Sequence, residues 1–219
     1  VRVVSGEGRF TGPNTLTVGD ETITFDSAIV AAGSSAAMLP GLPDDERIVD
    51  STGALEMPDI PERLLVVGGG IIGLEMAAVY DALGSKVTVV ELLDSLLPGV
   101  DPDLVKPLRK RIEGRYEAIH LSTKVEKVEA ADDGLKATFS NGQTETFDRV
   151  LVAVGRRPNG ANLSLDAAGV TVDEGGFVGL DAQMRTNVAH LHPIGDNVRE
   201  PMLALLDGPR GVRALGRGQ

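Results

Sequence analysis

Three glycines of this 219-residue chain have a spacing that suits binding of a dinucleotide pyrophosphate. Gly68, Gly70 and Gly73 form G-x-G-x-x-G directly after the apolar run at residues 64–67. In a strand–turn–helix unit, the first glycine allows a tight turn and the second lets the backbone approach the phosphates. The third lets the helix pack closely on the strand. The glycines alone are weak evidence, so the surrounding sequence must decide.

An acidic residue lies at the position where such a site binds the ribose hydroxyls. Glu91 follows the valine-rich, strand-like segment at residues 86–90 and comes 18 residues after Gly73. A carboxylate there accepts hydrogen bonds from the adenosine ribose hydroxyls and repels a 2′-phosphate, which favours NAD over NADP. The alternative is a solvated carboxylate at a strand end. We prefer the ribose interpretation, because the glycine turn and the strand pattern agree with it.

Four further residues suit a ligand but also have ordinary explanations. Gly155 and Arg156 follow an apolar run, and ligands bind beyond the carboxyl ends of parallel strands. Arg156 could equally be a surface charge. Asp196 follows a glycine and suits a polyol or ribose hydroxyl, or an ordinary turn. Glu75 lies just after Gly73, where an acid also suits the helix dipole.

The elements that must position these residues form a β–α–β unit. We predict a strand at 64–67, a helix at 70–83 and a strand at 86–90, because apolar residues recur first continuously and then at helical spacing. A second helix is expected from Asp101 or Asp103 to about Tyr116, with a late start or kink at Pro107. Asn141-Gly142 predicts a hairpin, and further strands are expected near 119–121, 125–130, 135–140, 143–147 and 150–154.

The flanking segments are predicted to be mostly β structure and loop. A short strand is expected at 1–4, a hairpin at 15–25 and a buried strand at 28–32. The proline-containing stretch 34–61 reads as a linker with a helical turn at 51–55. Residues 188–191 form another strand-like run.

A segment of the chain recurs at an offset of 122 residues. Residues 22–33 and 144–155 are identical at seven of twelve positions, and each follows a predicted hairpin. Chance similarity between two hairpin-to-strand units is the alternative explanation. If the repeat is real, the chain holds two dinucleotide-binding modules and begins inside the first one.

Composition excludes several functional classes. The net charge of −11 disfavours nucleic-acid binding and anionic membrane surfaces. No apolar run reaches membrane-spanning length, so we expect a cytoplasmic protein. The chain has no cysteine, which excludes disulfides and thiolate sites. Of its three histidines, His190 and His192 are two residues apart, but no third ligand is near in sequence, so we expect no metal site. It begins with Val rather than Met, which suggests a processed chain or a fragment.

The order of these motifs resembles the pyridine nucleotide-disulfide oxidoreductases. The resemblance rests on 68–75, 89–91, 154–159, 185–188, 194–196 and 201–204, and runs from about residue 1 to Ala204. It implies an α/β fold, with a three-layer Rossmann-like NAD-binding domain that carries a β-meander and with partial FAD-binding segments. The expected domains are an FAD segment with linker at 1–60, the NAD domain at 61–187, and a return to the FAD or central region at 188–219.

The resemblance also assigns site residues. Glu75 corresponds to a glutamate that supports the flavin side, no catalytic residue lies in this chain, and no metal is expected. The NAD group comprises Gly68, Gly69, Gly70, Ile71, Ile72, Gly73, Glu91, Val125, Gly155 and Arg156. The FAD group comprises Gly8, Ala32, Gly33, Ser34, Asp196, Met202, Leu203 and Ala204.

The activity implied by the resemblance is electron transfer from dihydrolipoyl groups, through a cysteine disulfide and FAD, to NAD. The implied partner is the lipoyl domain of a 2-oxo acid dehydrogenase complex, and the full-length family enzyme is expected to be a homodimer. The family's redox Cys-x4-Cys pair is absent from this sequence, and residues 205–219 depart from the family pattern. We therefore expect the chain itself to be inactive. The alternatives are another disulfide reductase of the family and a non-catalytic NAD-binding or interaction module.

Overall fold

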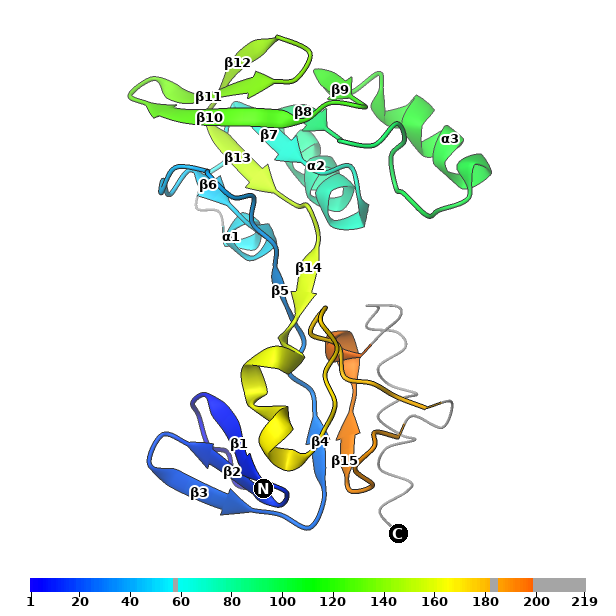
Figure 1. Cartoon of the computed structure of the whole chain (residues 1–219). Helices are drawn as coiled ribbons and strands as arrows, with labels where there is room; N and C mark the ends of the chain where they lie inside the picture. The colour runs from blue at the N-terminus through cyan, green and yellow to red at the C-terminus, as the bar shows by residue number, and fades with distance from the viewer. Residues whose placement is uncertain (57–58, 182–184, 199–219) are drawn as a thin grey trace. The chain divides into compact units, whose positions relative to one another are not determined.

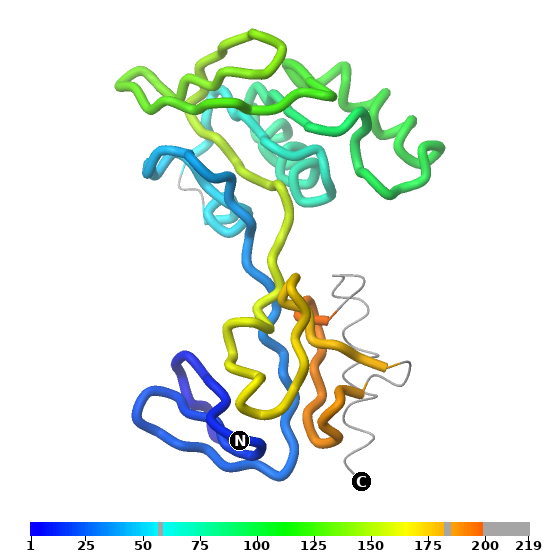
Figure 2. Tube along the Cα trace, in the orientation of Figure 1, coloured from blue at the N-terminus to red at the C-terminus, as the bar shows by residue number. Residues whose placement is uncertain are grey.

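The chain folds into two compact units, which we describe separately. The computed structural model describes residues 1–56, 59–181 and 185–198. One unit is continuous and comprises Ala36–Gly155, whereas the discontinuous unit combines Val1–Ser35 with Arg156–Gln219. Figure 1 labels the elements of both units, and Figure 2 follows the chain through them.

A five-stranded parallel sheet is the centre of the continuous unit. Its spatial order is β6-β13-β7-β8-β9, so β7 lies between the strand that follows it through a helix and one that arrives much later in the sequence. The strands are β6 (Ile48–Val49), β7 (Arg63–Val67), β8 (Lys86–Val90), β9 (Ala118–His120) and β13 (Arg149–Val152). After their first residues, Arg63, Lys86 and Arg149, the central strands β7, β8 and β13 are apolar except for Thr88, because both of their faces are buried.

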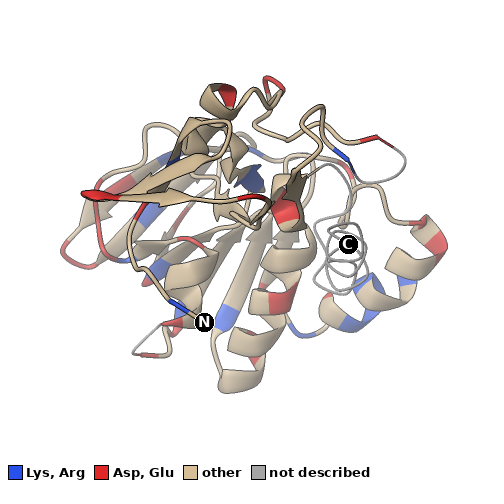
Figure 3. Ribbon diagram, turned by 90° about the horizontal axis from the view of Figure 1, so that it is seen from below, with Lys and Arg blue, Asp and Glu red and all other residues tan. Residues whose placement is uncertain are grey.

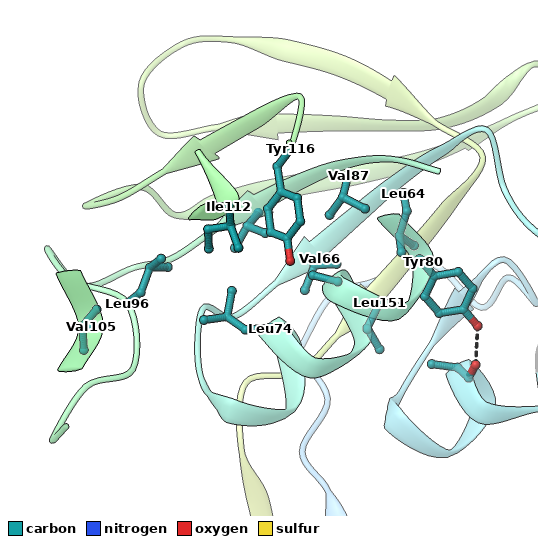
Figure 4. Close-up of a cluster of buried hydrophobic side chains, with 13 residues drawn as sticks. Leu64, Val66, Leu74, Tyr80, Val87, Leu96, Val105, Ile112, Tyr116 and Leu151 are labelled. Carbon is teal, nitrogen blue, oxygen red and sulfur yellow. Dashed lines mark hydrogen bonds between the residues drawn. The ribbon is translucent and has the colours of Figure 1, made fainter. Parts of the chain in front are cut away.

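Helices cover one face of this sheet. They are α1 (Ser51–Leu55), α2 (Ile71–Leu83) and α3 (Pro102–Ile112). Leu64, Val66 and Leu151 of the sheet pack with Leu74 and Tyr80 of α2, as Figure 4 shows. The Tyr80 hydroxyl donates a hydrogen bond to the carbonyl of Ala54 in α1, and burial raises the pKa of Tyr80.

An antiparallel meander covers the opposite face. It consists of β10 (Val125–Ala131), β11 (Gly134–Phe139) and β12 (Thr144–Phe147). Leu65 and Val67, which alternate with the helix-facing residues of β7, pack here against Phe139 and Phe147. The unit therefore has three layers, helix, sheet and meander, and the predicted α/β fold class is confirmed.

The discontinuous unit contains smaller sheets. β1 (Gly8–Gly12), β2 (Thr15–Val18) and β3 (Glu21–Thr24) form an antiparallel sheet, and β4 (Ala28–Val30) pairs in parallel with β15 (Leu191–Pro193). β5 (Ser34–Ala36) pairs with β14 (Arg156–Pro158). Short 3-10 helices η1 (Asn159–Leu163), η2 (Leu165–Ala168) and η3 (Gly195–Asn197) complete it. Its core includes Phe10, Val30, Leu165, Val178 and Leu191.

Some predicted element bounds were wrong. Residues 1–4 form no strand, and Val1 and Val3 are exposed. The helix expected to reach Tyr116 ends at Ile112. The strand expected at 188–191 lies instead at Leu191–Pro193, because its register is set by pairing with Ala28–Val30 of β4.

The two compact units divide the chain at other positions than 60/61 and 187/188, and the cofactor domains expected with those bounds stay a prediction. Residues 36–60 belong with the continuous unit, because β6 pairs with β13 and Ala54 joins the helix-side core. Residues 156–181 belong with the discontinuous unit, because Leu165 and Val178 bury beside Phe10. Long-range pairing, which has no local sequence signal, sets both divisions.

Charged residues are distributed over many elements. Lys and Arg residues are interspersed with Asp and Glu (Figure 3). Within the described residues, none of the helices has the length and apolar character needed to cross a bilayer. The same part of the chain contains no cluster of three or more His, Asp or Glu side chains that could hold a metal ion.

Candidate nucleotide-binding site

A largely apolar cleft of about 410 Å³ lies at the carboxyl ends of the central strands in the continuous unit. Val67 ends β7, Val90 ends β8, and Ala153 directly follows β13. The strand order changes direction at β7, and ligands of doubly wound sheets bind at this switch point. Gly68, Gly70, Glu91 and Val125, four of the residues assigned to NAD, line this single cleft.

The glycine turn is packed on one side and open on the other. Gly68 has φ +113°, and a side chain on it would meet the Ala153 carbonyl. A side chain on Gly73 would meet the Gly68 carbonyl, so α2 approaches the end of β7 more closely than any other residue would permit. Nothing lies within 4 Å of the position that a Gly70 side chain would occupy.

Gly70 is also the N-cap of α2 and provides no side-chain hydrogen bond there. The first amides of a helix lack intrahelical partners and carry partial positive charge. They point toward the position of an incoming anion at a helix N-terminus. Because the space beside Gly70 is open and the cap is bare, the turn suits a phosphate group. Ile71 and Ile72 supply the first residues of this helix.

Glu91 is buried, with 8% of its surface exposed, at the end of β8. Its Oε2 accepts a hydrogen bond of 2.7 Å from the Gly69 N–H, and its Oε1 accepts one of 2.8 Å from the Leu93 N–H. The carboxylate therefore lies beside the glycine turn, as the motif spacing predicts. Its two backbone partners were not foreseen from the sequence.

The cleft also contains residues that sequence reasoning missed. Leu39, Leu92, Leu93 and Pro98 provide apolar lining, and Thr123 and Lys124 border it next to Val125. Thr123 is held by its Oγ1–H, which donates to the Leu121 carbonyl at 2.8 Å. A signal was present in part, since Leu92, Leu93, Thr123 and Lys124 come shortly after predicted strands. The sequence of a loop does not indicate which strand ends it approaches, so Leu39 and Pro98 gave no signal.

Arg156 lies in the discontinuous unit, where it joins a polar cluster. Its Nε and Nη2 donate to the Ser34 Oγ and carbonyl, each at 2.6 Å, and Nε lies 3.8 Å from Asp196 Oδ2. The Ser34 hydroxyl in turn donates to Asp196 Oδ2 at 2.5 Å. The structure thus joins Arg156, assigned to NAD, with Ser34 and Asp196, assigned to FAD, so its NAD role stays a prediction.

The other predicted residues are distributed as follows. Gly8 and Ala32 line one cavity of about 430 Å³ in the discontinuous unit, and the next residue, Gly33, has φ +65°. Gly155 accepts a hydrogen bond from the Ala37 N–H at 2.9 Å and has open space at its Cβ position. Glu75 is an exposed residue of α2. Met202, Leu203 and Ala204 lie outside the described residues.

Residues 1–206 match the model of the pyridine nucleotide-disulphide oxidoreductase family. The chain belongs to this family. Among curated members, it is 53% identical over 213 residues to dihydrolipoyl dehydrogenase from Vibrio cholerae. The alignment covers 93% of this chain and 45% of that enzyme. The corresponding enzyme from Haemophilus influenzae is 48% identical, covering 93% and 44%. The chain therefore spans a little under half the length of these oxidoreductases.

Two solved structures, one of them a flavoprotein disulfide reductase, have the same fold. The HOCl-induced reductase RclA from Escherichia coli aligns with a TM-score of 0.88 at 26% identity, covering 95% of this chain and 48% of the reductase. LpdA from Mycobacterium tuberculosis aligns with a TM-score of 0.85 at 27% identity, covering 97% and 49%. The resemblance expected from the motifs is thus confirmed, both as family and as fold.

Proposed function

We propose that this chain is the NAD-binding part of an FAD-dependent dihydrolipoyl dehydrogenase. The observation that carries the proposal is the cleft at the strand ends, where the open N-cap Gly70 and the buried Glu91 lie together. The 53% identity to a dihydrolipoyl dehydrogenase, against 26% to RclA, favours this member of the family over another disulfide reductase.

The residues present fit NAD. The pyrophosphate would bind at the Gly70 end of α2, where the amides are bare. The adenosine would lie against Val125 and Leu92, with its ribose hydroxyls beside Glu91. Gly155, which has open space at its Cβ position, would let the backbone approach the nicotinamide half. When bound, NAD supplies a nicotinamide ring that accepts a hydride. This chain's contribution is to bind and orient that ring, and to repel a 2′-phosphate through the Glu91 charge.

The discontinuous unit is proposed to contribute to FAD binding. Gly8 and Ala32 would border part of the flavin nucleotide, because they share a cavity. Asp196 would accept a hydroxyl of the FAD ribityl chain, with Ser34 and Arg156 fixing its carboxylate. Asp196 retains a partly exposed side chain, 26% accessible, so its second oxygen can accept a further hydrogen bond. Glu75, Gly33, Met202, Leu203 and Ala204 keep the flavin-side roles expected from the resemblance.

The partners and location follow from the same proposal. The complete enzyme would act on the lipoyl domain of a 2-oxo acid dehydrogenase complex, as a cytoplasmic homodimer. The present chain has no cysteine to exchange with a dihydrolipoyl group. We therefore expect the chain to bind NADH without reducing NAD from dihydrolipoamide.

Calorimetric titration of the 219-residue chain with NADH and NADPH tests this proposal. We expect saturable NADH binding that is at least about tenfold tighter than NADPH binding, because an acid at this position excludes the 2′-phosphate. The control is Glu91→Ala, in which we expect a smaller difference between the affinities for NADH and NADPH. Absence of NADH binding would favour a structural or interaction role instead, and lipoamide-dependent NADH formation would contradict the expected inactivity.

A further inference from the structure

The segment that follows β8 holds both backbone groups of Gly69, the central residue of the glycine turn. The Gly69 N–H donates to Glu91 Oε2 at 2.7 Å, and the Gly69 carbonyl accepts from the Leu97 N–H at 2.9 Å. Gly69 is itself buried. A side chain on it would meet Leu96 Cδ2 at 2.6 Å and Glu91 Cβ at 3.1 Å. The Gly69 side of the turn is therefore packed against the segment 91–97.

The Glu91 carboxylate is fixed at both oxygens before any ligand arrives. Oε1 accepts from the Leu93 N–H at 2.8 Å, which ties the start of the segment to the same side chain. The Glu91 N–H donates to the His120 carbonyl and its own carbonyl accepts from the Thr123 N–H, at 2.8 and 2.9 Å. The carboxylate thus projects from a backbone that is hydrogen-bonded on both sides.

The other end of the segment contains a backbone outlier. Leu97 has φ +50°, a left-handed conformation that is uncommon for a residue other than glycine. From this conformation its N–H reaches Gly69, while the neighbouring Leu96 is buried in the helix-side core with 1% exposure. Such a conformation persists only where the surrounding contacts determine it. The contact between Leu97 and Gly69 is therefore one that the fold maintains against a local cost.

We propose that Glu91 is a positioning residue for the phosphate turn, in addition to its proposed contact with the ribose. By accepting the Gly69 N–H, the carboxylate holds the turn between β7 and α2 in the conformation that receives the pyrophosphate. This inference rests on the proposed function, because it assigns a second role to a residue of the same cleft. It predicts that loss of the carboxylate weakens phosphate binding even when the ligand has no ribose hydroxyl.

The mechanism is preorganisation. When a turn populates several conformations, its apparent affinity for a ligand is reduced in proportion to the fraction of molecules in the conformation that binds the ligand. Glutamine has one acceptor oxygen, so in Glu91→Gln one of the two backbone amides faces an NH₂ group and loses its partner. A buried amide without an acceptor is costly, so the turn and the segment 91–97 are expected to move apart.

The test compares ADP with 2′,3′-dideoxy-ADP, which retains both phosphates and lacks both ribose hydroxyls. For Glu91→Gln we expect the affinity for dideoxy-ADP to fall about tenfold by calorimetry. The matched control is Asp94→Asn, which removes one negative charge from the same segment. Asp94 is exposed and has no hydrogen bond or ion pair among the described residues, so this variant should bind dideoxy-ADP as the unmodified chain does.

If Glu91→Gln lowers the affinity for ADP but leaves the affinity for dideoxy-ADP unchanged, the carboxylate acts only by binding the ribose hydroxyls and the proposal is overturned. A measurement on the unmodified chain guards against a variant that does not fold. We expect the Gly69 and Leu93 amides to be protected from hydrogen exchange without nucleotide, and free exchange of both would also overturn the proposal. If the chain binds neither NADH nor ADP, the proposed function fails, while amide exchange still tests the contact itself.

Discussion

Replacing Gly70 and Gly73 by alanine, one at a time, is expected to damage different properties of the same turn. In Gly73→Ala the added methyl group would meet the Gly68 carbonyl oxygen, and it would lie 3.1 Å from the Gly68 carbonyl carbon and 3.3 Å from Val66 Cγ1. These atoms belong to the backbone and to a buried strand, so α2 must move away from β7. Overpacking of this kind costs about 1–3 kcal/mol.

The expected net loss in Gly73→Ala is smaller than the steric cost alone. Alanine is favoured over glycine inside a helix by about 1 kcal/mol, which offsets part of the overpacking. Because the added methyl group would meet backbone atoms, the upper end of the overpacking range applies, and we therefore expect the free energy of unfolding to fall by about 2 kcal/mol. The displaced helix should also weaken NADH binding, because it carries the amides proposed to hold the phosphates.

Gly70→Ala should leave stability nearly unchanged and weaken binding. No atom lies within 4 Å of the added methyl group, and the backbone of Gly70, with φ −79° and ψ −174°, is one that alanine adopts readily. The methyl group would instead occupy the space proposed for the phosphates, so we expect NADH affinity to fall at least about tenfold, or about 1.4 kcal/mol.

Urea denaturation and NADH titration of both variants check this pair of predictions. The reasoning about the phosphate site is refuted if Gly70→Ala binds NADH as tightly as the unmodified chain. The reasoning about helix packing is refuted if Gly73→Ala unfolds at the same urea concentration as the unmodified chain.

Three further predictions concern the stability of the continuous unit. Tyr80→Phe leaves the buried Ala54 carbonyl without its hydroxyl donor and should lower the free energy of unfolding by about 1–3 kcal/mol in urea titrations. Phe139→Ala empties a fully buried position between sheet and meander and should cost about 3–5 kcal/mol, measured in the same way. Hydrogen bonds from Arg47 lower the pKa of Asp45 from 3.8 to about 2, so its stabilisation should be complete above pH 3.8 and lost as the pH falls toward 2. The urea midpoint of Asp45→Asn should change less over that interval, and an identical pH profile would contradict this assignment.

Local patterns predicted the continuous unit well. The apolar run at 64–67 predicted a strand, which the structure confirms as β7, and Leu64 and Leu65 pack into the cores on opposite faces of the sheet. Asn141-Gly142 does lie at the hairpin between β11 and β12, with Gly142 at φ +84°. These features depend on residues close together in the sequence, so the sequence alone reveals them.

Features that depend on distant contacts were not predictable in the same way. The residues at 1–4 have a strand-like composition but find no partner strand among the described residues. Arg156 follows a strand at the expected place, yet its guanidinium is directed by Ser34, far away in the sequence. The spacing of Glu91 indicated a ligand contact and gave no sign of its hydrogen bond to Gly69. Every residue except proline has a backbone N–H, so the sequence does not indicate which of these groups a carboxylate will bind, and the three-dimensional structure is needed to show it.

The hydrogen bond between the Ala37 N–H and the Gly155 carbonyl, 2.9 Å long, brings the two ends of the continuous unit together. When the two ends of a segment lie close together, the segment can be inserted into another chain, or its own ends can be joined by a short linker, at a small cost in loop-closure entropy. Ala36–Gly155 therefore has ends placed suitably for circular permutation or for transfer between related proteins of the family. In such chimaeras the preference for NAD over NADP that we propose for Glu91 should be transferred with Ala36–Gly155 to the recipient protein.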